Sequence, residues 1–389
     1  MDLLEWEERL SKVFMRVYRL YFVLIYIAVV LSPVVISQTE SHSIQHRLEN
    51  LHQTLDSART VTAARLDSFF TTRNRMKLFN GAVLFAEYGE VVYKNAFGFA
   101  DFRKKDSMTV HTSFQLASIT KPITATAILM LYEQGMLSLE DTVSRFFPEF
   151  PYEDITIRLL LSHRSGLPEY MYFEEDYWPS RRITMNNDDV LNILISHQPP
   201  IYFIPDYRYN YSNTNYALLA SIIEKVSGLS YCDFMQKHLF EPLQMTNSIV
   251  YNRENRQDIK NRATGYSKRG RRAENSYLNG VVGDKGIYTT VEDLFKFDKA
   301  LFEQGLISDS TLQIACQPAH RDLRIWDNYG FGWRIDASDR NDRVVYHTGW
   351  WKGFRTYYIR KIDQHKTIIV LTNTARFNFL SVRRLRQLF

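Results

Sequence analysis

The sequence contains little cysteine. Only two of its 389 residues are cysteines, Cys232 and Cys316, and they have neither metal-ligand spacing nor the neighbours of a disulfide framework. Internal repeats, low-complexity tracts and lysine or arginine blocks with interleaved aromatic residues are also missing. Nucleic-acid binding is therefore not indicated, and we expect no metal ion and no other cofactor.

The composition is that of a globular protein. Hydrophobic residues make up 45% and aromatic residues 14% of the chain, which is enough for a substantial core in one large domain or two small ones. The formal net charge of +5 is spread over 48 basic and 43 acidic residues. The basic residues form only short clusters, such as residues 268–272.

One uncharged apolar run stands near the N-terminus, at residues 20–36. Its length, about 17 residues, is near the lower limit for a bilayer span. Lys12, Arg16 and Arg19 precede the run, and positive charge at that end directs the rest of the chain away from the cytoplasm. We therefore expect an extracytoplasmic protein of the periplasm or cell envelope, secreted or anchored in the membrane by this segment.

Three interpretations of the run stay open. It is a signal peptide cleaved near Gln38, an uncleaved membrane anchor, or, less favoured, a buried helix of a soluble protein. The buried helix is disfavoured because the polar stretch 38–59 resembles a linker. The predicted organisation is a signal peptide or anchor at 1–37, a linker at 38–59 and one domain at 60–389.

Strand patterns gather at both ends of that domain, and helix patterns lie between them. Residues 81–98 predict a hairpin around Tyr88 and Gly89, and residues 377–389 predict a closing helix. The late strands are expected at 332–335, 343–347, 354–361 and 367–371, and helices at 63–76, 118–134, 157–162, 188–196, 216–226, 231–239 and 291–302. The predicted fold class is α+β: an antiparallel sheet built from N- and C-terminal strands, flanked by helices, with a mostly helical insertion.

A serine and a lysine stand three residues apart where one of these helices begins. Pro122 follows Lys121 at once, and proline is tolerated in the first turn of a helix, so Ser118 lies near the helix start. The spacing puts Ser118 and Lys121 on one helical face. A buried lysine has an altered proton affinity and can help to remove the hydroxyl proton of the serine.

Two more short motifs come later in the chain. Tyr211 and Asn213 stand two residues apart before an apolar helix, so their side chains point the same way from a loop. A His347-Thr348-Gly349 sequence ends a predicted strand and is followed by Trp350, and the glycine lets a substrate lie along the strand edge.

The order of these three motifs resembles the serine β-lactamase family in its class C branch, with the related D-alanyl-D-alanine carboxypeptidases, D-aminopeptidases and esterases. Residues 160–168, 211–219 and 286–294 are also similar to the family pattern. The resemblance covers residues 63–389 and implies a β-lactamase/transpeptidase-like fold. No metal ion takes part in the mechanism that it implies.

The resemblance implies a role for each motif residue. Ser118 is the nucleophile, Lys121 takes its proton or keeps Tyr211 deprotonated, and Tyr211 is the general base that later protonates the leaving group. Asn213 holds the substrate amide and the lysine. The backbone N–H groups of Ser118 and Trp350 form the oxyanion hole, on the strand that carries His347, Thr348 and Gly349.

The chain departs from the family pattern at two positions. His347 replaces the lysine of penicillin-recognising members, so a permanent cation facing a substrate carboxylate is missing. We therefore expect esters and amides to be better substrates than penicillins, and activity on carboxylated substrates to improve toward pH 6 as His347 becomes charged. Lys285 stands where relatives have small residues, and we interpret it as a solvated loop residue rather than a compensating cation.

The leading hypothesis is an extracytoplasmic serine hydrolase that acts through an acyl-enzyme on an amide, a peptide or an ester. A D-alanyl peptidase, a D-aminopeptidase or an esterase is favoured over an efficient β-lactamase. The alternatives are a class C-like β-lactamase and a non-catalytic penicillin-binding or peptidoglycan-binding envelope protein. The expected partners are a small-molecule or peptide substrate, which includes peptidoglycan-derived ones, and the membrane; the oligomeric state is left open.

Overall fold

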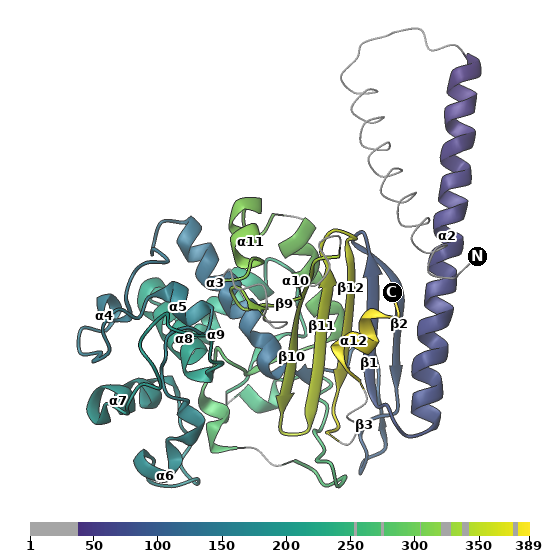
Figure 1. Cartoon of the computed structure of the whole chain (residues 1–389). Helices are drawn as coiled ribbons and strands as arrows, with labels where there is room; N and C mark the ends of the chain where they lie inside the picture. Colours follow the sequence, from purple (N-terminus) through teal and green to yellow (C-terminus); the bar gives the residue numbers. More distant parts are fainter. Residues whose placement is uncertain are drawn as a thin grey trace. The chain divides into compact units, whose positions relative to one another are not determined.

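Seven antiparallel strands form the main sheet, in which early and late strands of the domain lie side by side (Figure 1). The computed structural model describes residues 38–252, 255–273, 276–303, 305–319, 328–336, 342–375 and 380–389. The spatial order of the strands is β2 (Glu90–Phe97), β1 (Gly81–Glu87), β12 (Lys366–Thr372), β11 (Phe354–Lys361), β10 (Val344–Trp351), β9 (Arg334–Asp336) and β8 (Asn328–Tyr329). The predicted α+β fold class is confirmed.

The N-terminal hairpin forms where the sequence predicts it. Tyr88 and Gly89 both have positive φ angles, 52° and 70°, which match the twist of a two-residue hairpin turn. The first six residues of β1 are buried, because this strand is central and both of its faces are covered. Gly81 pairs with Thr372 on β12, so strands from opposite ends of the domain lie side by side.

Hydrophobic side chains cover both faces of the sheet. One face packs against the helical part of the domain through α10 (Val291–Glu303), whose residues contact β1 and β12. The other face carries a smaller cluster in which Leu66 and Phe70 join Leu385 of α12 (Val382–Arg386). Figure 1 shows α12 lying over the sheet. The closing helix expected at 377–389 is therefore present, but it is shorter than predicted.

Helices fill the middle of the chain, as the sequence predicts. Helix α5 (Ile157–Leu161) is capped by Thr156, whose hydroxyl accepts the Leu159 N–H, and Asn186 forms a capping box at the start of α7 (Asn187–His197). The remaining helices of this region are α3 (Thr120–Glu133), α4 (Val143–Phe146), α6 (Glu174–Tyr177), α8 (Asn213–Ser227), α9 (Tyr231–Met235) with a π-helical turn (Gln236–Phe240), and α11 (Asp309–Ala315). A small sheet of β5 (Phe114–Gln115), β7 (Ile287–Thr289) and β6 (Ile249–Val250) lies beside them.

The chain divides into two units, residues 1–59 and 60–389. Helix α2 (Gln38–Arg75) includes the segment 38–59 that was interpreted as a linker, and it also includes the helix predicted at 63–76. The apolar run at 20–36 and the cations before it lie outside the described residues. Within the described part of the chain, no helix combines the length and the apolar character that a bilayer span requires.

Candidate active site

Ser118 lies in a single 3-10 turn, Ala117–Ile119, that leads directly into helix α3. Ala117 just before it has a φ of +52°, a left-handed conformation that alanine rarely adopts. Such strain persists only where the surrounding structure imposes it, and it is concentrated at functional sites. Ala117 and Ile119 are buried, whereas Ser118 is half-buried, so the turn leaves the serine more accessible than its neighbours.

Lys121 is completely buried one turn after the serine. Its Nζ donates hydrogen bonds to Ser118 Oγ at 3.2 Å, to Asn213 Oδ1 at 2.7 Å and to the backbone oxygen of Asp284 at 3.0 Å. Burial lowers the pKa of Lys121 to about 8, against the opposing effect of the Asp284 and Glu169 carboxylates. A neutral Lys121 can therefore form near neutral pH and accept the proton of the serine.

Tyr211 and Asn213 stand at the start of helix α8 and face the same lysine. Lys121 Nζ lies 4.8 Å from the centroid of the Tyr211 ring. Burial raises the pKa of Tyr211, and a hydrogen bond with Ser118 only partly offsets this effect. Tyr211 thus keeps its proton in the resting state, and the site holds a phenol rather than a phenolate.

Asn213 is fixed by a residue that the sequence analysis did not single out. Its backbone N and its Nδ2 both donate to Glu169 Oε2, at 2.7 and 3.0 Å. With its Oδ1 bound to Lys121, the amide of Asn213 has a defined orientation. Glu169 comes directly after the 160–168 segment that resembles the family, which is the one sequence signal that could have identified it.

Lys285 is not a solvated loop residue, and that interpretation is wrong. Only 2% of it is exposed, and its Nζ donates to Tyr170 Oη, to the Val281 backbone oxygen at 3.2 Å and to Asp284 Oδ1 at 3.3 Å. Tyr170 Oη in turn donates to Asp284 Oδ2 at 3.1 Å. Because the backbone oxygen of Asp284 also accepts a hydrogen bond from Lys121, Asp284 connects the two buried lysines.

His347 is buried in strand β10. Its Nδ1 lies 2.9 Å from the Thr348 backbone oxygen, which can only accept, so Nδ1 carries the proton and Nε2 accepts from Tyr329 Oη at 3.0 Å. Burial, with Arg334 and Lys121 acting in the same direction, holds the pKa of His347 well below its usual range. The ring therefore stays neutral at pH 6, and the expectation that it becomes a cation for substrate carboxylates there is wrong.

The other residues of this motif lie where β10 meets the serine turn. A Cβ on Gly349 would lie 2.2 Å from both the Leu116 backbone oxygen and Thr356 Oγ1, so only glycine permits this contact. Thr348 is half-buried, and Trp350 is 66% exposed with the Arg355 guanidinium 5.4 Å from its ring. The structure therefore brings the residues of β10 to the turn that carries Ser118.

Arg334 of β9 is a cation that the sequence analysis missed. It pairs with Tyr346 on β10, and its guanidinium lies 5.3 Å from the centroid of the Tyr211 ring. Its positive charge partly offsets the effect of burial on the pKa of Tyr211, and it adds to the effect of burial on the pKa of His347. No local motif marks it, because its position depends on the pairing of β9 with β10.

His163 was also missed, although it lies within the segment 160–168. Its ring centroid is 4.3 Å from that of Tyr211. Its Nδ1 lies 3.3 Å from the backbone N of Ser212 and 3.2 Å from Asn215 Nδ2. Since the Ser212 N–H donates to Nδ1, the proton is on Nε2, and the imidazole packs against the tyrosine as a neutral ring.

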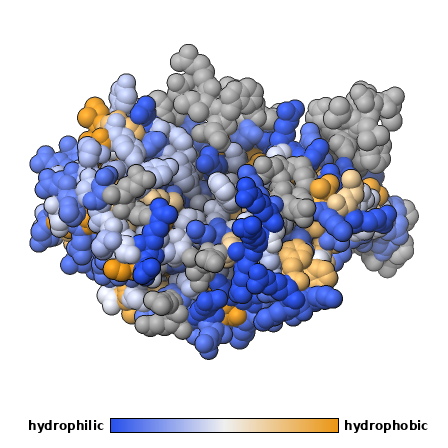
Figure 2. Space-filling model, turned by 90° about the horizontal axis from the view of Figure 1, so that it is seen from below, coloured by the Kyte–Doolittle hydropathy of each residue, from blue (hydrophilic) through white to orange (hydrophobic). Residues whose placement is uncertain are grey.

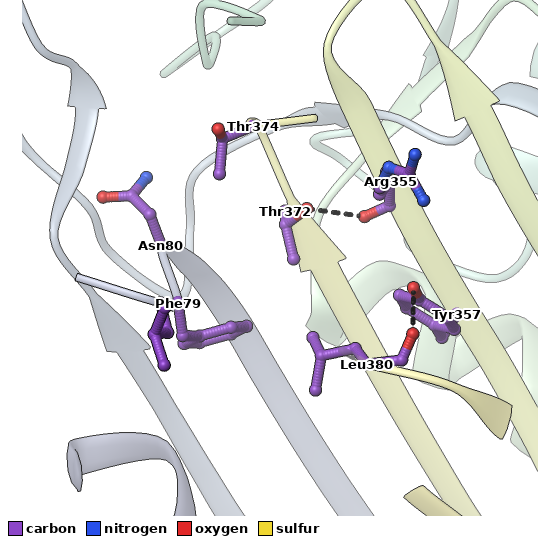
Figure 3. A pocket seen from close by; sticks show the side chains of 8 residues that line it. Phe79, Asn80, Arg355, Tyr357, Thr372, Thr374 and Leu380 are labelled. Carbon is purple, nitrogen blue, oxygen red and sulfur yellow. Dashed lines mark hydrogen bonds between the residues drawn. The ribbon is translucent and has the colours of Figure 1, made fainter. Parts of the chain in front are cut away.

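Away from Ser118, a pocket next to the start of β1 is too small for a substrate (Figure 3). Phe79, Asn80, Arg355 and Leu380 line it, and its volume of about 10 Å³ admits little more than one water molecule. In the described part of the chain, no group of three or more histidine, cysteine, aspartate or glutamate residues is placed to hold a metal ion.

Comparison with known proteins gives a consistent result. The family model described as Beta-lactamase matches residues 67–388. The chain is 39% identical to Penicillin-binding protein 4* of Bacillus subtilis over 321 residues, which is 79% of this chain and 71% of that protein. Several further curated relatives, named Protein flp from Staphylococcus aureus, are 28% identical, and the chain spans about three fifths of their length.

Solved structures share the fold. A penicillin-binding protein from Bacillus halodurans superposes with a TM-score of 0.72 at 26% identity, over 82% of this chain and 98% of that one. The D-amino acid amidase from Ochrobactrum anthropi SV3 superposes with a TM-score of 0.69 at 23% identity, over 82% of this chain and 93% of that one. At that identity the amidase supports the fold alone.

Proposed function

Because the chain belongs to the β-lactamase family and is a serine hydrolase of that superfamily, we propose that it cleaves an amide, a peptide or an ester outside the cytoplasm through an acyl-enzyme on Ser118. One observation carries the assignment of the nucleophile. The buried Lys121, with its pKa lowered to about 8, donates to Ser118 Oγ at 3.2 Å, so a base and a nucleophile are already in contact.

In the proposed mechanism, neutral Lys121 accepts the proton of Ser118 as Oγ attacks the carbonyl carbon. The backbone N–H groups of Ser118 and Trp350 stabilise the oxyanion that forms. Tyr211, a phenol at rest, protonates the leaving group and regains a proton through Lys121. Water then attacks the acyl group by the reverse of these steps, and Asn213 orients both the lysine and the substrate amide.

The proposed substrates follow from the charges around the site. His347 supplies no cation, because burial holds its pKa well below the usual range. Arg334, close to the Tyr211 ring, is the cation that we assign to a substrate carboxylate. We propose D-alanyl peptides, D-amino acid amides and short esters as substrates, in keeping with a relative named a penicillin-binding protein. Efficient β-lactam hydrolysis ranks behind them because His347 replaces the lysine of penicillin-recognising members.

The test of the nucleophile is covalent labelling. A fluorophosphonate or a slow penicillin should add one adduct to the purified protein, and peptide mapping should place it on Ser118. Ser118→Ala should give no adduct and should lose activity by about 10³ to 10⁶-fold, because such groups act as a unit. An adduct that persists in Ser118→Ala would contradict the assignment.

The extracytoplasmic location and the N-terminal anchor or signal peptide are proposed from the charges before the apolar run at 20–36. A reporter that is active only outside the cytoplasm, fused after residue 60, should be active in the full-length fusion. Replacing Lys12, Arg16 and Arg19 by glutamate should reduce its activity. An inactive reporter in the unchanged fusion, made at a normal level, would contradict the proposal.

A further inference from the structure

A cavity of about 420 Å³ is lined by three arginines, Arg181, Arg182 and Arg256. The other described residues that line it are uncharged, so the described wall carries positive charge alone. Figure 2 shows that hydrophilic side chains dominate the face of the molecule seen from below. Arginine presents a planar fork of donors that matches carboxylate and phosphate groups, so the natural occupant of such a cavity is an oxyanion.

The loop that carries two of these arginines is held in a defined position. Trp178 Nε1 donates to the Ile183 backbone oxygen at 3.1 Å, and the Met185 N–H donates to the Tyr277 backbone oxygen at 3.0 Å. Gly280 lets the chains approach closely, since a Cβ there would lie 2.5 Å from the Met185 backbone oxygen. The loop that carries Arg181 and Arg182 is therefore held by backbone hydrogen bonds and by close packing at Gly280.

The cavity wall touches the strand that carries the proposed oxyanion hole. Asn279, which lines the cavity, accepts a hydrogen bond from Trp351 Nε1 at 2.8 Å, and Trp351 directly follows Trp350. Lys285 Nζ lies 5.2 Å from the Trp351 ring on the side of the catalytic network. Trp351 therefore connects the cavity wall, through Asn279, to Lys285 of the network around Lys121.

Another cation, Lys352, lies at this end of β10 outside the cavity lining. Lys352 Nζ lies 5.3 Å from the Trp351 ring, and Arg181 is near enough to help burial lower the pKa of Lys352. An anion entering the cavity therefore meets several cations together. A bound anion reduces the repulsion between cations that lie close together, and this effect strengthens anion binding.

We propose that this cavity is an anion-binding subsite of the active site, and that the natural substrate carries a phosphate or a carboxylate away from the bond that is cleaved. The inference rests on the proposed function for its reaction, but it adds the class of substrate. Phosphate and carboxylate share the chemistry that arginine recognises, and the substrates used in the test separate them.

The kinetic test uses three esters that differ only in a distal hydroxyl, carboxylate or phosphate. The wild-type protein should show a higher kcat/KM for an anionic ester than for the hydroxyl ester, mainly through KM. In the double variant Arg181→Gln/Arg256→Gln, the ratio of kcat/KM for the anionic ester to kcat/KM for the hydroxyl ester should fall by about 10-fold for each arginine removed. Arg145→Gln on α4, which removes one positive charge outside the cavity, should leave the ratio unchanged.

The binding test separates this inference from the proposed function. Calorimetry on the Ser118→Ala protein should show saturable binding of inorganic phosphate or of citrate, and the double arginine variant should lose it. Anion binding without any hydrolysis by the wild type would support the subsite and contradict the proposed function. Hydrolysis with an unchanged substrate ratio in the double variant, and no saturable anion binding, would overturn the subsite and leave the proposed function intact.

Discussion

Lys121 and Tyr211 both lie against the serine, and burial moves their pKa values in opposite directions. The pKa of Lys121 is lowered to about 8, whereas that of Tyr211 is raised. At the pH of most cellular compartments the lysine is thus partly neutral while the tyrosine is a phenol. The first proton acceptor in our scheme is therefore Lys121, and Tyr211 acts after it.

This order predicts a pH profile. The rate of Ser118 acylation by a slow ester should rise with pH up to about 8 and level off above it, because only neutral Lys121 accepts a proton. Stopped-flow measurement of the acylation burst gives this rate. Lys121→Arg stays charged throughout and should be slower by about 10² to 10⁴-fold, without the inflection. An inflection retained in Lys121→Arg would show that another group is the base.

The neutral His347 leads to a second prediction. The ratio of kcat/KM between a carboxylated substrate and its neutral analogue should be flat from pH 6 to 8, because the ring does not titrate there. Arg334→Gln should lower this ratio by about 10-fold or more, since a charge-assisted hydrogen bond is lost. Equal losses on both substrates would mean that Arg334 only shapes the surroundings of Tyr211.

Residue identity alone could predict the motifs but not their environments. The Ser118 to Lys121 spacing and the order of the later motifs are local, so the sequence shows them directly. The burial of Lys285 and His347 and the position of Arg334 depend on contacts across the fold. A histidine or lysine in isolation has a known pKa, and only the finished structure says how far burial moves it.

At the scale of elements, the contact between β10 and the serine turn depends on Gly349. Gly349→Ala would place a Cβ against the Leu116 backbone oxygen and push the strand away from Ser118. We expect kcat to fall by about 10² to 10³-fold, the usual cost of losing an oxyanion donor, and circular dichroism to show a folded protein. Kinetic constants on a neutral ester measure the effect.

Gly135→Ala is the matched control for that substitution. Gly135 ends α3 with a φ of +69°, and a Cβ there meets nothing within 4 Å. The alanine should cost about 1 kcal/mol of stability through backbone strain, with no change in kcat. If Gly349→Ala resembles Gly135→Ala in kcat, β10 does not have to lie tightly against the serine turn for catalysis.

Most elements could be predicted because their signals are local. Thr156 and the pair of Tyr88 with Gly89 mark a helix start and a hairpin turn through their own backbone, and the structure has both. Lengths were less predictable. Strand β10 extends to Trp351, well beyond the predicted 343–347, because pairing with β11 continues to Phe354 and tolerates a glycine inside the strand.

At the scale of the whole molecule, the sheet separates two hydrophobic clusters, and only one of them adjoins the site. Leu385 belongs to the cluster on the other face, with Phe70 and Val83. Leu385→Ala should destabilise the protein by about 2 to 5 kcal/mol, as removal of a buried leucine usually does. Thermal unfolding measures this loss, and kcat of the folded protein should not change.

Ile314→Ala on α11 provides the control, because that side chain is 39% exposed and should cost far less stability. A fall in kcat for Leu385→Ala at a temperature where the protein is fully folded would contradict the separation of the two clusters. Such a result would mean that packing behind the sheet reaches the position of β10.

The pairing of β1 with β12 has a consequence for synthesis on the ribosome. Glu87 pairs with Lys366, and at about 5 to 20 residues per second the partner strand of β1 is made roughly 15 to 60 seconds after β1 itself. During that interval β1, an apolar strand that lies inside the finished sheet, has one edge without its partner strand β12. The backbone groups of that edge can pair with other chains during this period, and faster translation would shorten it.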